Sequence, residues 1–110
     1  WTRHLALDLA PVLMPTDRAV TLGLILTELV INANKYAYDG APGPIEISLE
    51  QHRSNFRLIV ADHGKGKHQT GKGFGTRMMT AMIGQLGGEL DYRDNKPGLR
   101  AILTAPIAPR

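Results

Sequence analysis

Three polar side chains recur at helical spacing inside an otherwise apolar segment. Glu28, Asn32 and Lys35 are four and three residues apart, so on an α-helix they share one face over two turns. Their neighbours are mostly leucine, isoleucine and valine, so the polar stripe is narrow and typical of a cleft lining; a solvated helix face is the alternative. Carboxylate and amide oxygens suit Mg²⁺, and a lysine beside them suits a phosphate. The stripe is a candidate site for a metal ion and a phosphorylated ligand.

A second candidate is the segment ADHGKGKHQTGKGFGT, residues 61–76, in which Asp62 is the only acid among five glycines. Asp62 follows an apolar run and is therefore expected at the end of a strand, where its carboxylate can accept hydrogen bonds from the exocyclic amine of a base. Gly64 and Gly66 would allow the base to lie close to the backbone. A flexible surface loop is the alternative interpretation.

The second half of this segment, Gly71-x-Gly73-x-Gly75, leads directly into a predicted helix, whose free N–H groups and dipole favour an anion. Residues 66–73 also come within one residue of the P-loop pattern G-x-x-x-x-G-K-[ST]. The mismatch falls on Gly73, which lacks the hydroxyl that would bind Mg²⁺, and a P-loop domain needs a parallel sheet. We therefore interpret the segment as two half-sites, one for a base and one for phosphates.

Hydrophobic periodicity predicts the elements that carry these residues. Hairpin-linked strands with two intervening helices indicate an α+β fold: a two-layer α/β sandwich with a mixed, mostly antiparallel sheet and helices on one face. We expect one domain, residues 1–110. The predicted elements are a strand over Arg3–Leu9, a helix over Arg18–Tyr38 capped by Thr16 or Asp17, strands Ile45–Glu50 and Phe56–Ala61 joined at Ser54-Asn55, a helix over Thr76–Leu86 stopped by Gly87-Gly88, and a hairpin of Glu89–Arg93 and Leu99–Pro106.

Composition narrows the functional classes. The chain of 110 residues has no cysteine, which excludes disulfides and thiolate metal sites. No apolar run approaches the ~18 residues of a membrane span, and the N-terminus shows no secretory signal pattern. The net charge of +3 is scattered, and the few aromatic residues do not interleave with basic runs, which disfavours nucleic-acid binding. We expect a cytoplasmic protein with neither nucleic acid nor membrane as a partner.

Together, E-x-x-x-N-x-x-K-Y on a helix, D-x-G-x-G after a strand and G-x-G-x-G before a second helix resemble the ATP-binding domain of the GHKL superfamily. The resemblance extends from Leu5 to Pro106. ELVINANKYAY and GKGFGTRMMTAMIGQLGGEL are most similar to a sensor histidine kinase catalytic domain. The short span between the glycine boxes resembles the HWE-type kinases, and the missing Trp-x-Glu favours their sister subfamily.

The resemblance implies ATP and Mg²⁺ as cofactors and a role for each matching residue. Asn32 corresponds to the Mg²⁺-binding asparagine of the N box. Glu28 occupies the N-box position that is a general base in the hydrolases and a polar or acidic residue in the kinases, and it would reach the metal directly or through water. Asp62 corresponds to the adenine-reading aspartate. The other matches are Lys35 and Tyr36 on the phosphate and nucleotide side, Gly64 and Gly66 beside the aspartate, Gly71, Gly73, Phe74, Gly75 and Thr76 at the triphosphate, and Thr104 supporting the adenine contact through water.

The resemblance also implies transfer of the γ-phosphoryl group to a histidine on a separate dimerisation and phosphoacceptor domain, with a response regulator downstream in two-component signalling. None of the chain's four histidines is predicted on an acceptor helix. We therefore expect the chain to be a fragment of a longer sensor kinase. Two alternatives stay open: an anti-sigma-type serine kinase switch and a non-catalytic nucleotide-binding module. A gyrase-type ATPase would need far more chain.

Overall fold

The computed structural model describes residues 5–9, 12–37, 43–64, 77–95 and 98–108, with side chains described throughout except at 5–9 and 34–37. The elements follow the predicted order. They are β1 (Leu5–Leu9), α1 (Thr16–Ala37), β2 (Ile45–His52), β3 (Asn55–Asp62), α2 (Arg77–Gln85), β4 (Glu89–Asp94) and β5 (Leu99–Pro106).

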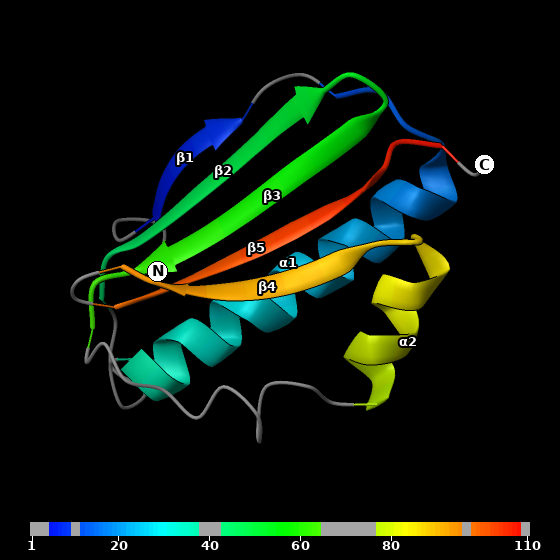
Figure 1. Cartoon of the computed structure of the whole chain (residues 1–110). Coiled ribbons are helices and arrows are strands. Elements are labelled where there is room, and N and C mark those ends of the chain that lie inside the picture. The colour runs from blue at the N-terminus through cyan, green and yellow to red at the C-terminus, as the bar shows by residue number, and fades with distance from the viewer. Residues whose placement is uncertain (1–4, 10–11, 38–42, 65–76, 96–97, 109–110) are drawn as a thin grey trace.

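The five strands form one sheet in the order β1-β2-β3-β5-β4, in which β1 pairs with β2 in parallel and every other pairing is antiparallel. Both helices lie on the same face of the sheet (Figure 1). Helix α1 packs against β3 and β5, and α2 packs against α1 and β4. The predicted two-layer α+β fold with a mixed, mostly antiparallel sheet is confirmed.

Strand alternation explains the core between these layers. Along β5, residues 99, 101, 103 and 105 are buried, whereas 100 and 104 are exposed. The innermost side chains include Ile25 on α1, Met79 on α2, Phe56 and Leu58 on β3, and Leu103 on β5, each at most 2% exposed. Full burial of such side chains contributes roughly 1.5–3 kcal/mol apiece. This core fixes the position of α1 relative to the central strands.

Two local boundaries differ from the sequence prediction. The amide of Ala19 donates to the carbonyl of Pro15 at 3.0 Å, so Pro15 occupies the N-cap position of α1. Asp17, proposed as a cap, instead lies in the first turn, where its charge complements the helix dipole. The β2–β3 turn is Arg53-Ser54 rather than Ser54-Asn55, because Asn55 pairs with His52; Arg53 has a φ of 60°.

The predicted glycine stop of α2 is confirmed. Gly87 has a φ of 66°, which glycine adopts at little steric cost. Its amide donates to Gly84 and the amide of Gly88 donates to Ile83, both at 3.0 Å. These two bonds form a Schellman motif, which satisfies carbonyls that the helix end would leave unpaired.

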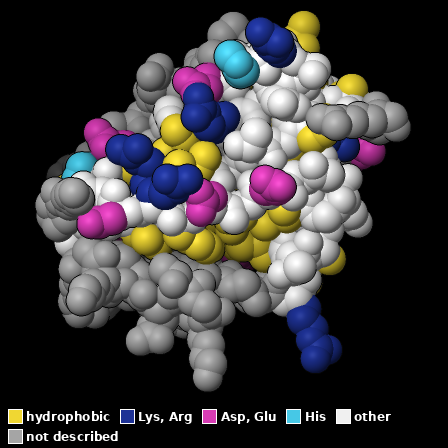
Figure 2. Space-filling model, in the orientation of Figure 1, with side chains coloured by type: hydrophobic (Ala, Val, Ile, Leu, Met, Phe, Trp, Pro, Cys, Tyr) yellow, Lys and Arg dark blue, Asp and Glu magenta, His cyan; other side chains and the backbone are white. Residues whose placement is uncertain are grey.

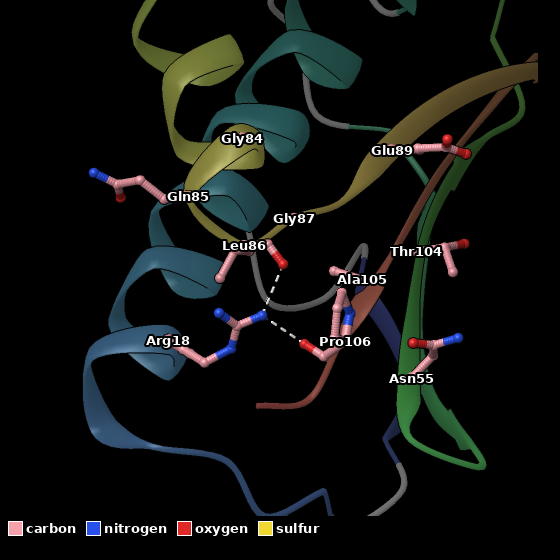
Figure 3. A pocket seen from close by; sticks show the side chains of 10 residues that line it. All are labelled: Arg18, Asn55, Gly84, Gln85, Leu86, Gly87, Glu89, Thr104, Ala105 and Pro106. Carbon is pink, nitrogen blue, oxygen red and sulfur yellow. Dashed lines mark hydrogen bonds between the residues drawn. The ribbon is translucent and has the colours of Figure 1, made fainter. Parts of the chain in front are cut away.

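A buried arginine joins the two helices to the sheet at this end of the molecule. Arg18, 6% exposed, donates to the carbonyls of Leu86 at 2.8 Å, Pro106 at 2.6 Å and Ile107 at 3.0 Å. Its cation lies at the C-terminus of α2, where the helix dipole favours it. A cavity of about 500 Å³ adjoins it (Figure 3), lined by Arg18, Asn55, Gly84, Gln85, Leu86, Gly87, Glu89, Thr104, Ala105 and Pro106.

The outer face of the sheet carries charges of both signs side by side (Figure 2). Exposed pairs include Arg57 with Glu50 and Arg93 with Asp91, both at 2.7 Å. Such pairs contribute about 0–1 kcal/mol each, so they matter more for the surface potential than for stability. The interspersed signs make this face a poor match for a nucleic-acid backbone. No helix within the described ranges is long and apolar enough to cross a membrane.

Candidate functional site

The carboxylate of Asp62 is held at the C-terminal end of β3. Asp62 is 2% exposed, and its Oδ1 accepts hydrogen bonds from the amides of Gly64 and Leu99, both at 3.1 Å. Charge-assisted bonds of this kind are roughly twice as strong as neutral ones and fix the rotamer of the side chain. The side chain is therefore oriented before any ligand binds.

Asp62 and Asn32 line the same small pocket, so α1 and the end of β3 bring together two residues singled out from the sequence. The pocket measures about 10 Å³, space for a single water molecule, so a purine base would have to widen it. Apart from these two polar residues its walls are largely apolar. The lining consists of Leu29, Asn32, Ala33, Val60, Asp62, Tyr92, Leu99 and Ala101.

Asn32 carries an unsatisfied group in this pocket. The residue is 6% exposed, and its Nδ2 is buried with no hydrogen-bond partner among the described residues. An unpaired buried polar group costs about 1–3 kcal/mol, which a ligand atom that accepts a hydrogen bond from this nitrogen would offset. An amide offers one oxygen, a ligand type that Mg²⁺ accepts, and donors that suit a phosphate or ribose oxygen. Asn32 thus fits the groups that the sequence predicted.

The other predicted site residues differ in where they lie and in whether the structure describes them. Glu28 is half-buried one helical turn before Asn32 and does not line the pocket. Lys35 and Tyr36 belong to the last turns of α1, and their side chains lie outside the described part. Gly64 lies beside Asp62, to which it donates. The predictions for Gly66, Gly71, Gly73, Phe74, Gly75 and Thr76 fall outside the described residues.

The structure does not bring Thr104 to this pocket. Thr104 pairs with Arg57 near the other end of β3 and is exposed, whereas Asp62 is buried at the opposite end. It lies five residues beyond Leu99, or about 17 Å along the strand. Because Thr104 alternates with the buried residues 103 and 105, its side chain points to the outer face of the sheet, away from the helices. The prediction that Thr104 supports a base contact is wrong, and β5 contributes the apolar Leu99 and Ala101 to the pocket instead.

His63 also points away from the pocket. The residue is exposed, and its Nε2 lies 3.0 Å from Oε1 of Glu46 on the neighbouring strand β2. Because successive side chains of an extended segment alternate in direction, His63 faces outward where Asp62 faces inward. His63 is therefore a surface residue and does not line the pocket with Asp62.

Tyr92 on β4 was not identified from the sequence, although it lines the pocket opposite the residues of α1. Burial raises the pKa of its hydroxyl above the ordinary value of 10.0. The phenol therefore stays neutral throughout the physiological range. The only sequence signal for its burial is the alternation of the strand, because Tyr92 lies two residues after Leu90 and therefore on the same face.

The raised pKa of Tyr92 predicts a specific pH dependence of stability. The folded state favours the protonated phenol, so this contribution is complete below about pH 10 and is lost as the pH rises through the folded-state pKa. Tyr92→Phe should therefore lose less stability than the wild type between about pH 8 and about pH 11. Urea unfolding at both pH values measures the difference; equal losses in the two proteins would contradict the assignment.

The β4–β5 turn packs directly against Asp62. The side-chain amide of Asn95 donates to the main-chain carbonyl of Asp62 at 2.7 Å. Gly98, with a φ of 111°, lies so close that an added Cβ would be 2.0 Å from that carbonyl oxygen. Sequence reasoning recognised the segment only as a turn, because nothing local indicates that a residue 33 positions away lies beneath it.

A five-stranded mixed sheet covered on one face by two helices, with a buried carboxylate and amide between the helix layer and the sheet, defines a domain of the GHKL fold. Residues 2–100 match the family model described as the histidine kinase-like ATPase domain, and the chain belongs to that family.

Individual relatives agree with this assignment. The chain is 29% identical over 106 residues to the sensor histidine kinase PdtaS of Mycobacterium tuberculosis (strain ATCC 25618 / H37Rv), a match that covers 88% of this chain and 21% of PdtaS. The chain thus spans about a fifth of the length of this curated relative.

Two solved structures share the fold. The blue-light activated histidine kinase of Erythrobacter litoralis EL346 superimposes with a TM-score of 0.81 at 22% identity, over 94% of this chain and 35% of that one. The histidine kinase AdeS of Acinetobacter baumannii gives a TM-score of 0.70 at 23% identity, over 96% of this chain and 56% of that one. The predicted resemblance to histidine kinase catalytic domains is confirmed.

Proposed function

We propose that this chain is the catalytic domain of a longer sensor histidine kinase, which binds Mg·ATP and donates the γ-phosphoryl group to a histidine on a separate dimerisation and phosphoacceptor domain. The observation that carries the proposal is the pocket in which the oriented carboxylate of Asp62 and the partly unsatisfied amide of Asn32 meet between α1 and the sheet. Family membership supports a kinase role in two-component signalling.

Asp62 would read the base. An ionised carboxylate only accepts hydrogen bonds, so it selects a base that presents an amine, as adenine does, over one that presents a carbonyl. The apolar walls provided by Leu29, Val60 and Leu99 would pack on the base and exclude water from this contact. Exclusion of water strengthens the hydrogen bond between carboxylate and amine.

Asn32 would hold the polar part of the nucleotide. It lies on the side of the pocket formed by α1, whose later residues include Lys35. Mg²⁺, when bound, neutralises charge on the phosphates; Asn32 would contribute an oxygen to it, and Glu28 would reach it through water. Lys35 and the glycines before α2 would complete the phosphate contacts. Phosphoryl transfer depends chiefly on such positioning and charge stabilisation.

In the transfer step, a nitrogen lone pair of the acceptor imidazole attacks the γ-phosphorus, and the bond to the β–γ bridging oxygen breaks. ADP leaves with that electron pair, and the imidazole loses a proton. In this proposal the acceptor histidine belongs to the phosphoacceptor domain, and the response regulator is a further partner that acts after it.

Incubating the chain with labelled ATP and a candidate acceptor domain tests the step. An acid-labile phosphate on the acceptor supports a histidine kinase, an acid-stable phosphate indicates a serine kinase, and no phosphate indicates a binding module.

Asn32→Ala provides a second test of the proposal. Removing the amide should abolish most of the gain in ATP affinity that Mg²⁺ gives the wild type, a loss of about tenfold, or roughly 1.4 kcal/mol. Titration with fluorescent ATP, with and without Mg²⁺, measures this gain. Asn55→Ala is the matched control, because Asn55 lies at the opposite end of β3 from Asp62. An undiminished Mg²⁺ gain in Asn32→Ala would contradict the role.

A further inference from the structure

Asp62 is also held by contacts from the turn between β4 and β5. The side-chain nitrogen of Asn95 donates to the main-chain carbonyl of Asp62 at 2.7 Å. The backbone ladder between β3 and β5 ends one residue earlier, at the pair Ala61 and Arg100. The amide of Asn95 therefore contacts β3 just beyond its last backbone pair with β5.

Asn95 is itself fixed on two sides. Its amide nitrogen on the main chain donates to the carbonyl of Gly98 at 3.1 Å, which closes the turn. The guanidinium of Arg100 donates to its Oδ1 at 3.3 Å. With the oxygen occupied by a donor, the side-chain nitrogen is directed at Asp62, so the orientation of the amide is determined by its partners.

These contacts act on the carboxylate as well as on the backbone. Leu99, which follows the turn, donates its amide to Oδ1 of Asp62. A shift of the turn would therefore move a donor of the carboxylate and the carbonyl contact together. Gly98 allows this close approach, since any Cβ there would lie 2.8 Å from Oδ1.

We infer that Asn95 is a positioning residue for nucleotide selectivity: it sets the angle at which Asp62 presents its carboxylate to the base. The inference rests on the proposed function, in which Asp62 reads an exocyclic amine. Asn95 need not touch the nucleotide itself. A purely structural role would lower stability, whereas a positioning role also lowers the preference for a base that carries the amine.

The test compares ATP with inosine triphosphate, which has a carbonyl where ATP has the amine. A site built to hydrogen-bond one group rejects an analogue without it strongly, so the wild-type chain should prefer ATP by about a hundredfold or more. Asn95→Asp places an oxygen against the Asp62 carbonyl, and Asn95→Ala removes the contact without adding charge. Both should reduce the preference about tenfold, mainly through weaker ATP binding. Dissociation constants are measured by titration calorimetry, with thermal unfolding recorded for each protein.

The controls distinguish this inference from the proposed function. Asn55→Asp makes the same chemical change at the far end of β3 and should keep the wild-type preference. Asp62→Asn should abolish the preference. If Asp62→Asn abolishes it but both Asn95 variants keep it, the positioning role is wrong and the proposed function stands. If Asn55→Asp reduces it as much as the Asn95 variants do, the positioning role is also wrong. If Asp62→Asn changes neither affinity nor preference, the proposed base contact fails.

Discussion

Asp62→Asn should weaken ATP binding by about a hundredfold, or roughly 2.7 kcal/mol, the largest effect we expect from an isosteric change in this chain. The retained oxygen can still accept the amides of Gly64 and Leu99. The new NH₂ group, however, would be a donor facing the donor amine of the base. Loss of a charged hydrogen bond and the mismatch of two donors act in the same direction. Equilibrium titration with fluorescent ATP measures the loss.

The matched control for this experiment is Asp91→Asn on β4. Asp91 forms an exposed pair with Arg93 on the sheet, so its replacement removes the same charge without touching the pocket. ATP affinity should be unchanged in this control. If Asp62→Asn binds ATP as tightly as the control does, Asp62 does not read the base.

Gly98→Ala should destabilise the fold by about 3 kcal/mol or more. An added Cβ would lie 2.0 Å from the carbonyl oxygen of Asp62 and 2.6 Å from its carbonyl carbon. These are backbone atoms at the end of a central strand and cannot rotate away as a flexible side chain could. The φ of 111° adds strain for any residue with a side chain. Urea denaturation measures the change in the free energy of unfolding.

Gly23→Ala is the opposite case and serves as the control. Gly23 lies within α1, and nothing stands within 4 Å of where its Cβ would be. Alanine is the better helix former, so this variant should gain about 0.5–1 kcal/mol. The two substitutions are chemically identical, so opposite signs isolate the effect of the surroundings of Gly98, namely its contact with Asp62 and its φ of 111°. A Gly98→Ala protein as stable as the wild type would contradict the close packing.

Periodicity was sufficient to predict the fold because each element expresses its own pattern locally. The alternation in β2 and β5, the long apolar stretch of α1 and the Gly87-Gly88 stop are all readable within one element. Asp62 and Asn32 were likewise conspicuous as polar residues inside apolar surroundings. Their meeting in one pocket followed from the resemblance of the whole pattern to a known fold.

The residues that sequence reasoning missed act across long separations. Asn95 contacts a residue 33 positions earlier, and Leu99 contacts one 37 positions earlier. Neither residue type predicts such a contact by itself. Thr104 was misplaced for a related reason: its type matched the expected role, but the register of β5 pairs it with Arg57, far from Asp62 along β3. Strand register, which decides both cases, depends on pairing between distant segments.

The interior place of β5 in the sheet constrains the order in which the chain can fold. β5 follows all other strands in sequence yet lies between β3 and β4, so β4 has no partner within the sheet until β5 arrives. The bonds from Arg18 to Leu86, Pro106 and Ile107 likewise join positions separated by 68 to 89 residues. Contacts of such separation require loop closure at a high entropic cost and slow folding. During synthesis, the β2–β3 hairpin and α1 can associate early, whereas the pocket around Asp62 is completed only after residues 95–101 have been made.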